Sequence, residues 1–238
     1  MNLEPAPLDF APDGTPFSPL YGDVYHTSSG GVAQARHVFL AGNDLPARWQ
    51  GRQHFVIAET GFGLGVNFLT TWQAWRSDPQ ACHSLHFVSL EKHPLSVVDL
   101  ARTHAALPDL AGLADLSGQL CAQWPPLRGG EHRLEFAAGR LTLTLFFGDA
   151  ALLLPQLQLQ ADAFYLDGFS PALNPDLWSP ELCRQLAQCA AREATLATWS
   201  VAGHVRRALQ NAGFLLEKRP GFSGKRQMLA GKRMRDIF

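Results

Sequence analysis

Short apolar runs recur along the chain and are bounded by glycine, proline or acidic residues. The most distinct of them are residues 54–58, 85–90, 141–147, 163–166 and 194–199. Runs of this length that end in turn residues are typical of buried strands. Longer stretches with helical character lie between or after them, at residues 67–75, 95–107 and 201–211. This alternation predicts an α/β fold with a mostly parallel sheet.

Two pairs of apolar runs are close enough in sequence to form hairpins. Residues 134–136 and 141–147 are separated by a short segment that contains Gly139, and residues 214–218 and 227–230 are joined by a glycine-containing turn. The second pair predicts an antiparallel hairpin that closes the sheet. Ligands of mostly parallel sheets bind at the carboxyl ends of the strands, so we expect the site there.

The first fifty residues differ from the rest of the chain. Five prolines within residues 1–20 exclude a helix there and predict an extended arm on the surface. The apolar segment at residues 34–40 predicts a short strand or helix that leads into a turn at Gly42 and Asn43. We therefore expect an N-terminal arm and cover segment at residues 1–50, packed on one domain formed by residues 51–238.

The composition argues against several classes of protein. Of the 238 residues, 46% are apolar and 17% are charged, which suits a single sizeable core. Apolar runs stay well short of the roughly 18 to 20 residues of a membrane span, and the first residues lack the features of a secretory signal. Four cysteines without a CxxC pair and histidines without ligand spacing indicate neither a disulfide framework nor a metal site. We expect a cytoplasmic protein without a membrane or metal partner.

Positive charge is concentrated at the C-terminal end. The formal net charge is -1, yet residues 206–238 contain nine Lys or Arg and only two acidic residues. Clustered positive charge counters a phosphate backbone, and distant acidic residues do not cancel it beyond a Debye length of roughly 8 to 10 Å. The basic end is therefore either a nucleic-acid contact or an ordinary solvated face.

A glycine-rich loop follows the strand expected at residues 54–58. Its sequence is Glu59-Thr60-Gly61-Phe62-Gly63-Leu64-Gly65, and alternating glycines let the backbone turn sharply and pass close to a ligand. A dinucleotide fingerprint would need its third glycine at position 66, which is Val66. The G-x-G-x-G spacing, preceded by an acid, instead suits S-adenosylmethionine, whose ammonium would face the carboxylate. A tight turn without a ligand is the alternative.

Three further acidic residues come directly after apolar strands, namely Glu91, Asp149 and Asp167. Together with Glu59 they should gather on one rim of the sheet, where the parallel strands end. A carboxylate accepts two hydrogen bonds at once, which suits Glu91 to both hydroxyls of a ribose. Asp149 suits the amino group of an adenine. Taken singly, each acid also fits a turn or a helix N-cap.

Residues 167–178 form a stiff segment with polar and aromatic side chains. It contains two prolines, a carboxylate at Asp167, an amide at Asn174, and the aromatic residues Phe169 and Trp178. Aromatic rings stack on flat substrates such as an extruded base, although a tryptophan here is as often a core anchor. We expect a loop on the acceptor side of the site, with Asp167 as the catalytic group.

Together these motifs resemble the methyltransferase domain of the bacterial tRNA wobble-uridine enzyme MnmC and its free-standing form MnmD. The resemblance is most specific at residues 167–178 and also covers residues 25–49, 59–69, 91–94, 148–150 and 200–228. It implies a Rossmann-like, S-adenosylmethionine-dependent methyltransferase fold, with a mostly parallel seven-stranded sheet and a closing antiparallel hairpin. The chain departs from the family pattern at Gln34, where an acid is expected, and at His26, where an aromatic residue is commoner.

The resemblance implies the reaction and its partners. A methyl group passes from S-adenosyl-L-methionine to the amine of 5-aminomethyl-2-thiouridine, in the anticodon region of tRNA, giving 5-methylaminomethyl-2-thiouridine. Two-domain members contain a flavin-dependent oxidase that acts before methylation. The chain has no second dinucleotide fingerprint, so we expect a separate oxidase as an upstream partner; the alternative is that the chain is a detached half of a longer enzyme.

The expected site residues follow from the motifs and the resemblance. Cofactor-binding residues are expected to be Glu59, Thr60, Gly61, Phe62, Gly63, Gly65, Asn67, Glu91, Lys92, Gly148, Asp149 and Asp167. Substrate-binding residues are expected to be Phe169, Pro171, Asn174, Trp178, Arg206, Lys225 and Arg226. Further contacts to the tRNA are expected from Lys218, Arg219, Lys232, Arg233 and Arg235.

Three other interpretations of the sequence remain open. A nucleotide-binding oxidoreductase is disfavoured by Val66 and by the lack of a substrate histidine. A catalytically silent RNA-binding module is disfavoured by the intact Glu59, Asp149 and Asp167. A methyltransferase of another amine or base is opposed only by the basic C-terminal end and the acceptor loop.

Overall fold

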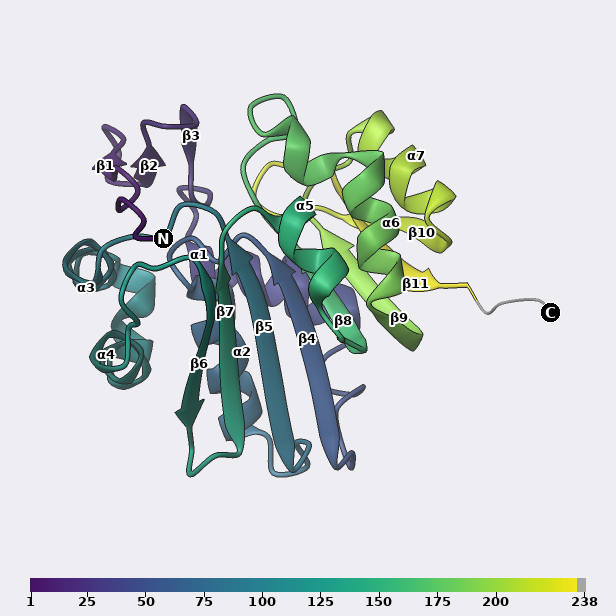
Figure 1. The fold of residues 1–238 in the computed structure, drawn as a ribbon, viewed down its shortest axis with the longest axis horizontal. Helices are drawn as coiled ribbons and strands as arrows, with labels where there is room; N and C mark the ends of the chain where they lie inside the picture. The colour runs from purple at the N-terminus through teal and green to yellow at the C-terminus, as the bar shows by residue number, and fades with distance from the viewer. Residues whose placement is uncertain (235–238) are drawn as a thin grey trace.

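Eight strands form the central sheet of the computed structural model, which describes residues 1–234 (Figure 1). The strands are, in spatial order, β10 (Phe214–Pro220), β11 (Gln227–Arg233), β9 (Ala190–Thr198), β8 (Ala161–Leu166), β4 (His54–Thr60), β5 (Ser84–Glu91), β7 (Leu141–Phe147) and β6 (Gly130–Phe136). The five strands from β9 to β7 are parallel to one another, whereas β6, β10 and β11 are antiparallel to their neighbours. The expected α/β class is confirmed. The expected count of seven strands is wrong, because three antiparallel strands join the five parallel ones, β10 and β11 at one edge and β6 at the other.

Helices cover both faces of the sheet, in three layers (Figure 1). One face carries α1 (Gly31–Gln34), η1 (Ala35–Leu40), η2 (Ala41–Asn43), α2 (Val66–Ser77), α3 (Val97–Ala106), η3 (Pro108–Leu113) and α4 (Ala114–Ala122). The other face carries α5 (Ala150–Leu153), η4 (Leu154–Gln156), η5 (Pro175–Trp178), α6 (Pro180–Gln188) and α7 (Gly203–Asn211).

Strand β4 illustrates why the inner strands are almost wholly apolar. Alternate residues point to opposite faces of a sheet, so Phe55 and Ile57 enter one hydrophobic cluster while Val56 and Ala58 enter the other. A parallel strand covered on both faces has no solvent side, which removes the need for polar alternation. The two clusters hold the sheet rigid, and its carboxyl ends become a fixed rim for functional side chains.

The N-terminal fifty residues fall into two structurally different parts. Residues 1–30 contain the short strands β1 (Asp9–Phe10), β2 (Pro16–Ser18) and β3 (Asp23–Val24), which pair into a small antiparallel sheet. Residues 34–40, expected as a strand or a helix, are helical. Phe39 and Trp49 are fully buried in the same cluster as β4 and α2. Residues 31–49 therefore contribute to the main core, whereas residues 1–30 form the arm.

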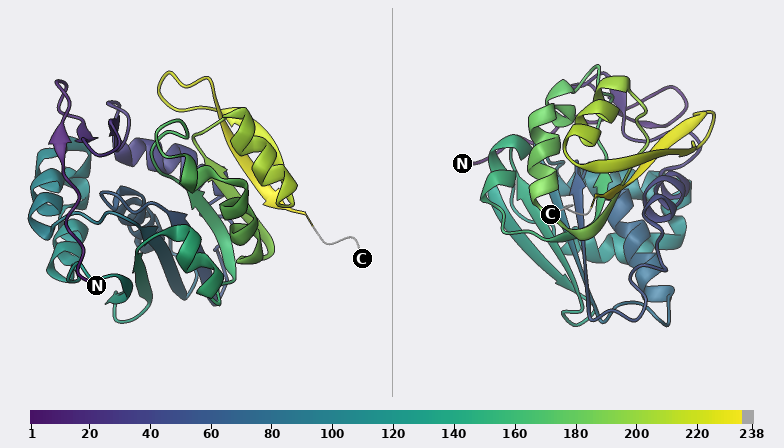
Figure 2. Two further views of the ribbon diagram at one scale, coloured as in Figure 1. Left: turned by 45° about the horizontal axis from the view of Figure 1, so that its top comes forward. Right: turned by 90° about the vertical axis from the view of Figure 1, so that its right-hand side faces the viewer.

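The arm lies over the carboxyl ends of the parallel strands. Helices α3 and α4 flank this end on one side, and the β10–β11 hairpin lies on the opposite side (Figure 2). The arm is tied to the neighbouring loops by hydrogen bonds, including one from the backbone N–H of Ala6 to the carbonyl oxygen of Pro94, 2.9 Å long. Segments far apart in sequence thereby surround one end of the sheet.

Candidate functional site

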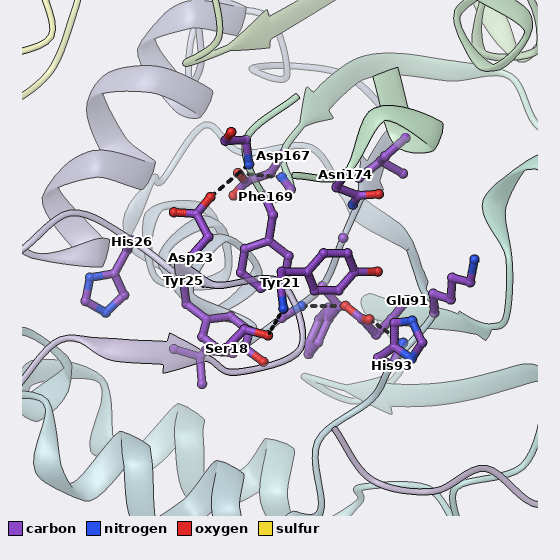
Figure 3. Close-up of a pocket in the computed structure, with 18 of the residues that line it drawn as sticks. Ser18, Tyr21, Asp23, Tyr25, His26, Glu91, His93, Asp167, Phe169 and Asn174 are labelled. Carbon is purple, nitrogen blue, oxygen red and sulfur yellow. Dashed lines mark hydrogen bonds between the residues drawn. The ribbon is translucent and has the colours of Figure 1, made fainter. Parts of the chain in front are cut away.

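A cavity of about 270 Å³ opens at this end of the sheet. Its walls come from the glycine loop and from the segments that follow β5, β7, β8 and β9, with the arm across the front (Figure 3). Small-molecule sites typically measure roughly 300 to 1,000 Å³, so this cavity is close to the lower end of that range. Three of the acidic residues that the sequence placed on one rim of the sheet, Glu91, Asp149 and Asp167, thus line this cavity.

The glycine loop contributes Gly61, Phe62, Gly63 and Leu64 to the wall of the cavity. Gly63 lines the cavity with φ at 52°, and a Cβ atom there would lie 3.2 Å from the ring of Tyr25. Gly65 lies outside the lining. A Cβ atom at Gly65 would come within 2.7 Å of the Phe62 ring, so this glycine serves loop packing. Thr60 also lies outside the lining and donates its hydroxyl to the carbonyl oxygen of Asp167, at 2.9 Å.

Glu59 lies behind the loop and does not line the cavity. Glu59 is only 1% exposed. Its two carboxyl oxygens accept hydrogen bonds from Ser89 Oγ at 2.7 Å and from Asn67 Nδ2 at 2.9 Å. Burial raises the pKa of Glu59 well above its ordinary value, and these two hydrogen bonds oppose the rise. The expected contact of Glu59 with a cofactor ammonium is therefore replaced by a contact with Asn67, which does line the cavity.

Glu91 lines the cavity after β5 and is held by backbone groups. Its Oε2 atom accepts from the N–H of Gly63 at 2.9 Å, and its Oε1 atom accepts from the N–H of His93 at 2.7 Å. Each carboxylate oxygen has two lone pairs, so both oxygens keep one for a ligand. The side chain is thus fixed in place while its capacity to accept two hydroxyl donors remains.

Asp149 lines the cavity and is also the N-cap of α5. Its Oδ1 atom accepts from the N–H of Ala151 at 3.0 Å, and its Oδ2 atom accepts from Lys92 Nζ at 2.8 Å. The hydrogen bond from Lys92 lowers the pKa of Asp149 and keeps it ionised. The capping role left open from the sequence is present, alongside the position in the cavity wall. Lys92 and Gly148 line the same wall.

Asp167 is fixed by three donors from three parts of the chain. Oδ2 accepts from Asn67 Nδ2 at 2.8 Å, whereas Oδ1 accepts from the N–H of Gly168 at 2.8 Å and from Trp199 Nε1 at 3.2 Å. Burial raises the pKa of Asp167, and the three hydrogen bonds and the charge of Lys225 oppose the rise. Asn67 joins the two buried acids, because the same nitrogen donates to Glu59 and to Asp167.

The acceptor loop contributes Phe169 and Asn174 to the cavity, but neither Pro171 nor Trp178. Trp178 is 3% exposed, packs edge-to-face against Trp199, and donates Nε1 to the carbonyl oxygen of Phe169 at 2.9 Å. The stacking role expected for Trp178 is therefore wrong, and the core-anchor alternative holds. Its hydrogen bond instead fixes the backbone that carries Phe169.

The arm supplies further lining residues that were not predicted from the sequence, among them Tyr21, Asp23 and Tyr25. The Tyr21 ring stacks on Phe169 with centroids 4.5 Å apart, and the Tyr25 ring packs edge-to-face on Phe169 at 5.2 Å. Asp23 points toward the acceptor loop and accepts from the N–H of Ser170 at 2.9 Å (Figure 3). The local signal available was their composition, two tyrosines on either side of an acid within five residues.

The two departures from the family pattern lie in the arm (His26) and in the adjoining helix α1 (Gln34). Gln34 lines the cavity, and its Oε1 atom accepts from the N–H of Thr27 at 3.1 Å. His26 is buried, with Nδ1 at 2.9 Å from the carbonyl oxygen of Thr27 and with no hydrogen-bond partner for Nε2 among residues 1–234. The amide of Gln34 therefore anchors the turn that brings the arm over the cavity.

Several basic residues expected to contact tRNA are used inside the fold. Arg219 donates to the carbonyl oxygens of Ala41 and Gly42 and pairs with Asp44 at 3.0 Å. Arg233 donates to the carbonyl oxygens of Ala187 and Ala190. Their expected role is corrected accordingly, because these guanidinium groups already bind carbonyl oxygens.

The other basic residues differ in their surroundings. Lys225 lines the cavity, whereas Arg206 and Arg226 do not. The side chains of Lys218 and Arg226 are exposed and make no hydrogen bond or ion pair with other side chains of residues 1–234. Lys232 lies 3.9 Å from the carboxylate of Glu193. Arg235 lies outside the described residues.

Neither a metal cluster nor a membrane span is present in the part of the chain that the structure describes. No group of three or more His, Cys, Asp and Glu side chains within residues 1–234 is placed to hold a metal ion. None of the helices in that range is both long enough and apolar enough to cross a bilayer. The walls of the candidate site present carboxylate, amide and aromatic side chains.

Comparison with known proteins identifies the family of the site. Residues 111–234 match a family described as S-adenosyl-L-methionine-dependent methyltransferases. A protein of Aromatoleum aromaticum described as "tRNA 5-methylaminomethyl-2-thiouridine biosynthesis bifunctional protein MnmC" is 60% identical over 237 residues. The protein of the same description from Azoarcus is 62% identical over 232 residues. These matches cover 100% and 98% of this chain but 37% and 36% of the relatives, so the chain spans little more than a third of their length.

Solved structures agree with the fold. The crystal structure of MNMC2 from Aquifex aeolicus superposes with a TM-score of 0.78 at 22% identity, covering 98% of this chain and 71% of that one. A spermidine synthase bound to a transition state analogue superposes with a TM-score of 0.54 at 8% identity, covering 98% of this chain and 74% of that one. At these identities the likeness concerns the fold alone.

Proposed function

Because this chain belongs to the family of S-adenosyl-L-methionine-dependent methyltransferases, we propose that it methylates the amine of 5-aminomethyl-2-thiouridine in the anticodon region of tRNA. The product is 5-methylaminomethyl-2-thiouridine, the nucleoside named in the description of the two relatives. The observation that carries the proposal is that one cavity is lined both by Glu91 and Asp149, which suit a ribose and an adenine, and by Asp167 and Phe169, which suit an amine and a flat base.

The cavity wall fits S-adenosyl-L-methionine in its donor chemistry. We assign the ribose hydroxyls to Glu91, whose two oxygens each keep a free lone pair, and the adenine to the segment of Gly148 and Asp149. The backbone of Gly61, Phe62 and Gly63, with the amide of Asn67, holds the rest of the molecule. Lys92 does not need to touch the cofactor, because its hydrogen bond holds Asp149 in position. Glu59 holds Asn67 in position in the same way. The bound cofactor supplies a methyl group on a sulfonium, which is the electrophile.

In this proposal, Asp167 orients the acceptor amine by accepting one of its hydrogen atoms in a hydrogen bond. The amine attacks in its neutral form; a nitrogen–carbon bond forms, the carbon–sulfur bond breaks, and the methylated nitrogen then loses a proton. Alignment of reactants in an enclosed site lowers the activation barrier by up to roughly 7 to 11 kcal/mol. A rigidly held Asp167 that only orients the amine can therefore account for a large rate increase. A rate that stayed independent of pH below 7 would exclude attack by a neutral amine.

The acceptor base is proposed to lie against Phe169, beside Asn174. Tyr21 and Tyr25 fix the Phe169 ring, so the arm prepares an aromatic surface for a flat base. The exposed Lys218 and Arg226 of the C-terminal hairpin are available for tRNA phosphates. A tRNA substrate also places the proposed activity in the cytoplasm.

The expectation of a separate upstream oxidase is revised. The two relatives are described as bifunctional, which means that a single polypeptide carries both of their functions. We propose that the present chain corresponds to the methyltransferase function of such proteins. Its acceptor is then the nucleoside that already carries a free aminomethyl group.

The test uses labelled S-adenosyl-L-methionine and tRNA that carries 5-aminomethyl-2-thiouridine, with nucleoside mass analysis of the product. We expect methyl transfer by the protein and a loss of about a hundredfold or more in Asp167→Ala, because misplaced reactants lose that much rate. Glu131→Ala removes one exposed carboxylate on the edge strand β6, away from the cavity, and is the matched control. Cofactor binding without transfer to this nucleoside would point to another acceptor or to a silent RNA-binding module.

A further inference from the structure

Lys225 lies in the turn between β10 and β11 and reaches the acceptor part of the cavity. Its Nζ atom lies 3.6 Å from the centroid of the Trp199 ring, and Trp199 Nε1 in turn donates to Asp167 Oδ1 at 3.2 Å. The Trp199 indole therefore lies between the Lys225 ammonium and the Asp167 carboxylate and contacts both. A cation over the face of a tryptophan ring is favoured in its charged form.

The charged groups that face Lys225 are acidic. Burial lowers the pKa of Lys225, and the charges of Asp167, which follows β8, and of Asp23, which belongs to β3 of the arm, oppose this fall. Tyr25 and His26 of the arm line the same cavity, and His37 of η1 contacts Phe222 in the same turn as Lys225. A second, smaller hollow beneath the lysine is lined by uncharged side chains apart from Lys225 itself. Lys225 is the cation that these two carboxylates face.

An amine acceptor creates an electrostatic conflict in such a site. The Asp167 carboxylate that orients the amine also stabilises its ammonium form, which has no lone pair for attack. A positive charge close to the same position acts in the opposite direction. We propose that Lys225 offsets the charge of Asp167 and so keeps the acceptor amine neutral, an assignment that rests on the proposed function.

The assignment makes Lys225 a charge-balancing residue rather than only an anchor for tRNA phosphate. An anchor would change the affinity for tRNA equally at every pH. A charge-balancing group changes the pH at which the bound amine becomes reactive, and it does so through its charge rather than its shape. These two roles are therefore separable by a pH profile.

The test measures single-turnover methyl transfer from pH 6 to 10, with saturating cofactor and tRNA bearing 5-aminomethyl-2-thiouridine. We expect the midpoint of the rate increase to move upward by about one pH unit in Lys225→Met, a tenfold loss below the midpoint that disappears at high pH. Lys225→Arg keeps the charge and should keep the midpoint. Lys218→Met removes a positive charge from the same hairpin, outside the cavity, and should leave the midpoint in place whatever it does to tRNA affinity.

A second measurement needs no turnover. With S-adenosylhomocysteine bound, the affinity for tRNA bearing the aminomethyl group is compared with the affinity for tRNA bearing unmodified uridine at pH 7. In Lys225→Met the aminomethyl tRNA should gain about tenfold relative to the unmodified one, because its ammonium then faces Asp167 alone. An unmoved midpoint together with an unchanged ratio would overturn the assignment and leave the proposed function intact. Absence of transfer by the unaltered protein at every pH would instead remove the proposed function, and this assignment with it.

Discussion

Replacing Asn67 by alanine tests the bridge between the two buried acids. The Asn67 amide donates to Glu59 Oε1 at 2.9 Å and to Asp167 Oδ2 at 2.8 Å. Hydrogen bonds to charged groups contribute about 1.5 to 3 kcal/mol each, and the Glu59 carboxyl, in a residue that is 1% exposed, would lose one of its two side-chain donors. Because Asp167 is more exposed than Glu59, we expect a total loss of about 3 kcal/mol in the free energy of unfolding. In a domain of this size that corresponds to a fall in Tm of roughly 6 to 12 °C.

The loss in Asn67→Ala should depend on pH. Burial already raises the pKa of both carboxyl groups, and the amide favours their ionised forms, so its removal raises both pKa values further. An acid with a raised pKa in the folded state binds more protons there than when unfolded, and stability then falls as the pH rises above the ordinary carboxylate pKa. The difference between the variant and the unaltered protein should therefore be larger at pH 8 than at pH 5.

Urea unfolding followed by circular dichroism at pH 5 and pH 8 measures both effects. Gln73→Ala is the control, because Gln73 is an amide on the same helix that hydrogen-bonds the surface residues Ser77 and Arg76. Its expected loss is within about 0.5 kcal/mol. If Asn67→Ala lost no more than this control, the bridge between Glu59 and Asp167 would contribute nothing to stability, and the reasoning above would be refuted.

Two other predictions follow from buried side chains. Trp178→Ala should lower the free energy of unfolding by about 3 to 5 kcal/mol in urea titrations, since it empties a core position that is 3% exposed; a loss below 1 kcal/mol would contradict the core-anchor role. Burial, with the nearby charges of Arg133 and His54, lowers the pKa of His86 to about 4, so its imidazole should stay neutral at pH 6. Because the unfolded chain takes up that proton first, this histidine reduces stability as the pH falls from about 6.5 to about 4, and an NMR titration midpoint near 6.5 would contradict its burial.

The parts of the fold that sequence predicted are those specified by local pattern. The strand at residues 54–58, the glycine loop after it and the acids at the ends of β5, β7 and β8 were identifiable because strand period, turn residues and chain order are local properties. Order along the chain was enough to place Glu91, Asp149 and Asp167 on one rim, since parallel strands end on the same side. The extra edge strand was the error, because the number of strands depends on which hairpins join the sheet.

The parts that sequence did not predict depend on contacts between distant segments. Nothing local distinguishes Arg219 or Arg233 from a free phosphate-binding arginine; only their positions beside the carbonyl oxygens of Ala41 and Ala187 do so. The same holds for Glu59, whose carboxyl is turned away from the cavity by Ser89 and Asn67. A residue type and its place in a motif define what a side chain can bind, and the packed structure decides which partner it has.

Asp167 shows how such partners limit chemistry. An ionised carboxylate has about four positions at which it accepts hydrogen bonds. Three are taken by the protein, two on Oδ1 by Gly168 and Trp199 and one on Oδ2 by Asn67. One position remains, on Oδ2, and its direction is fixed because the other three donors hold the carboxylate from separate elements. A group with one free acceptor position in a fixed direction can align a single N–H of an incoming amine, which is the role that the proposed reaction asks of it.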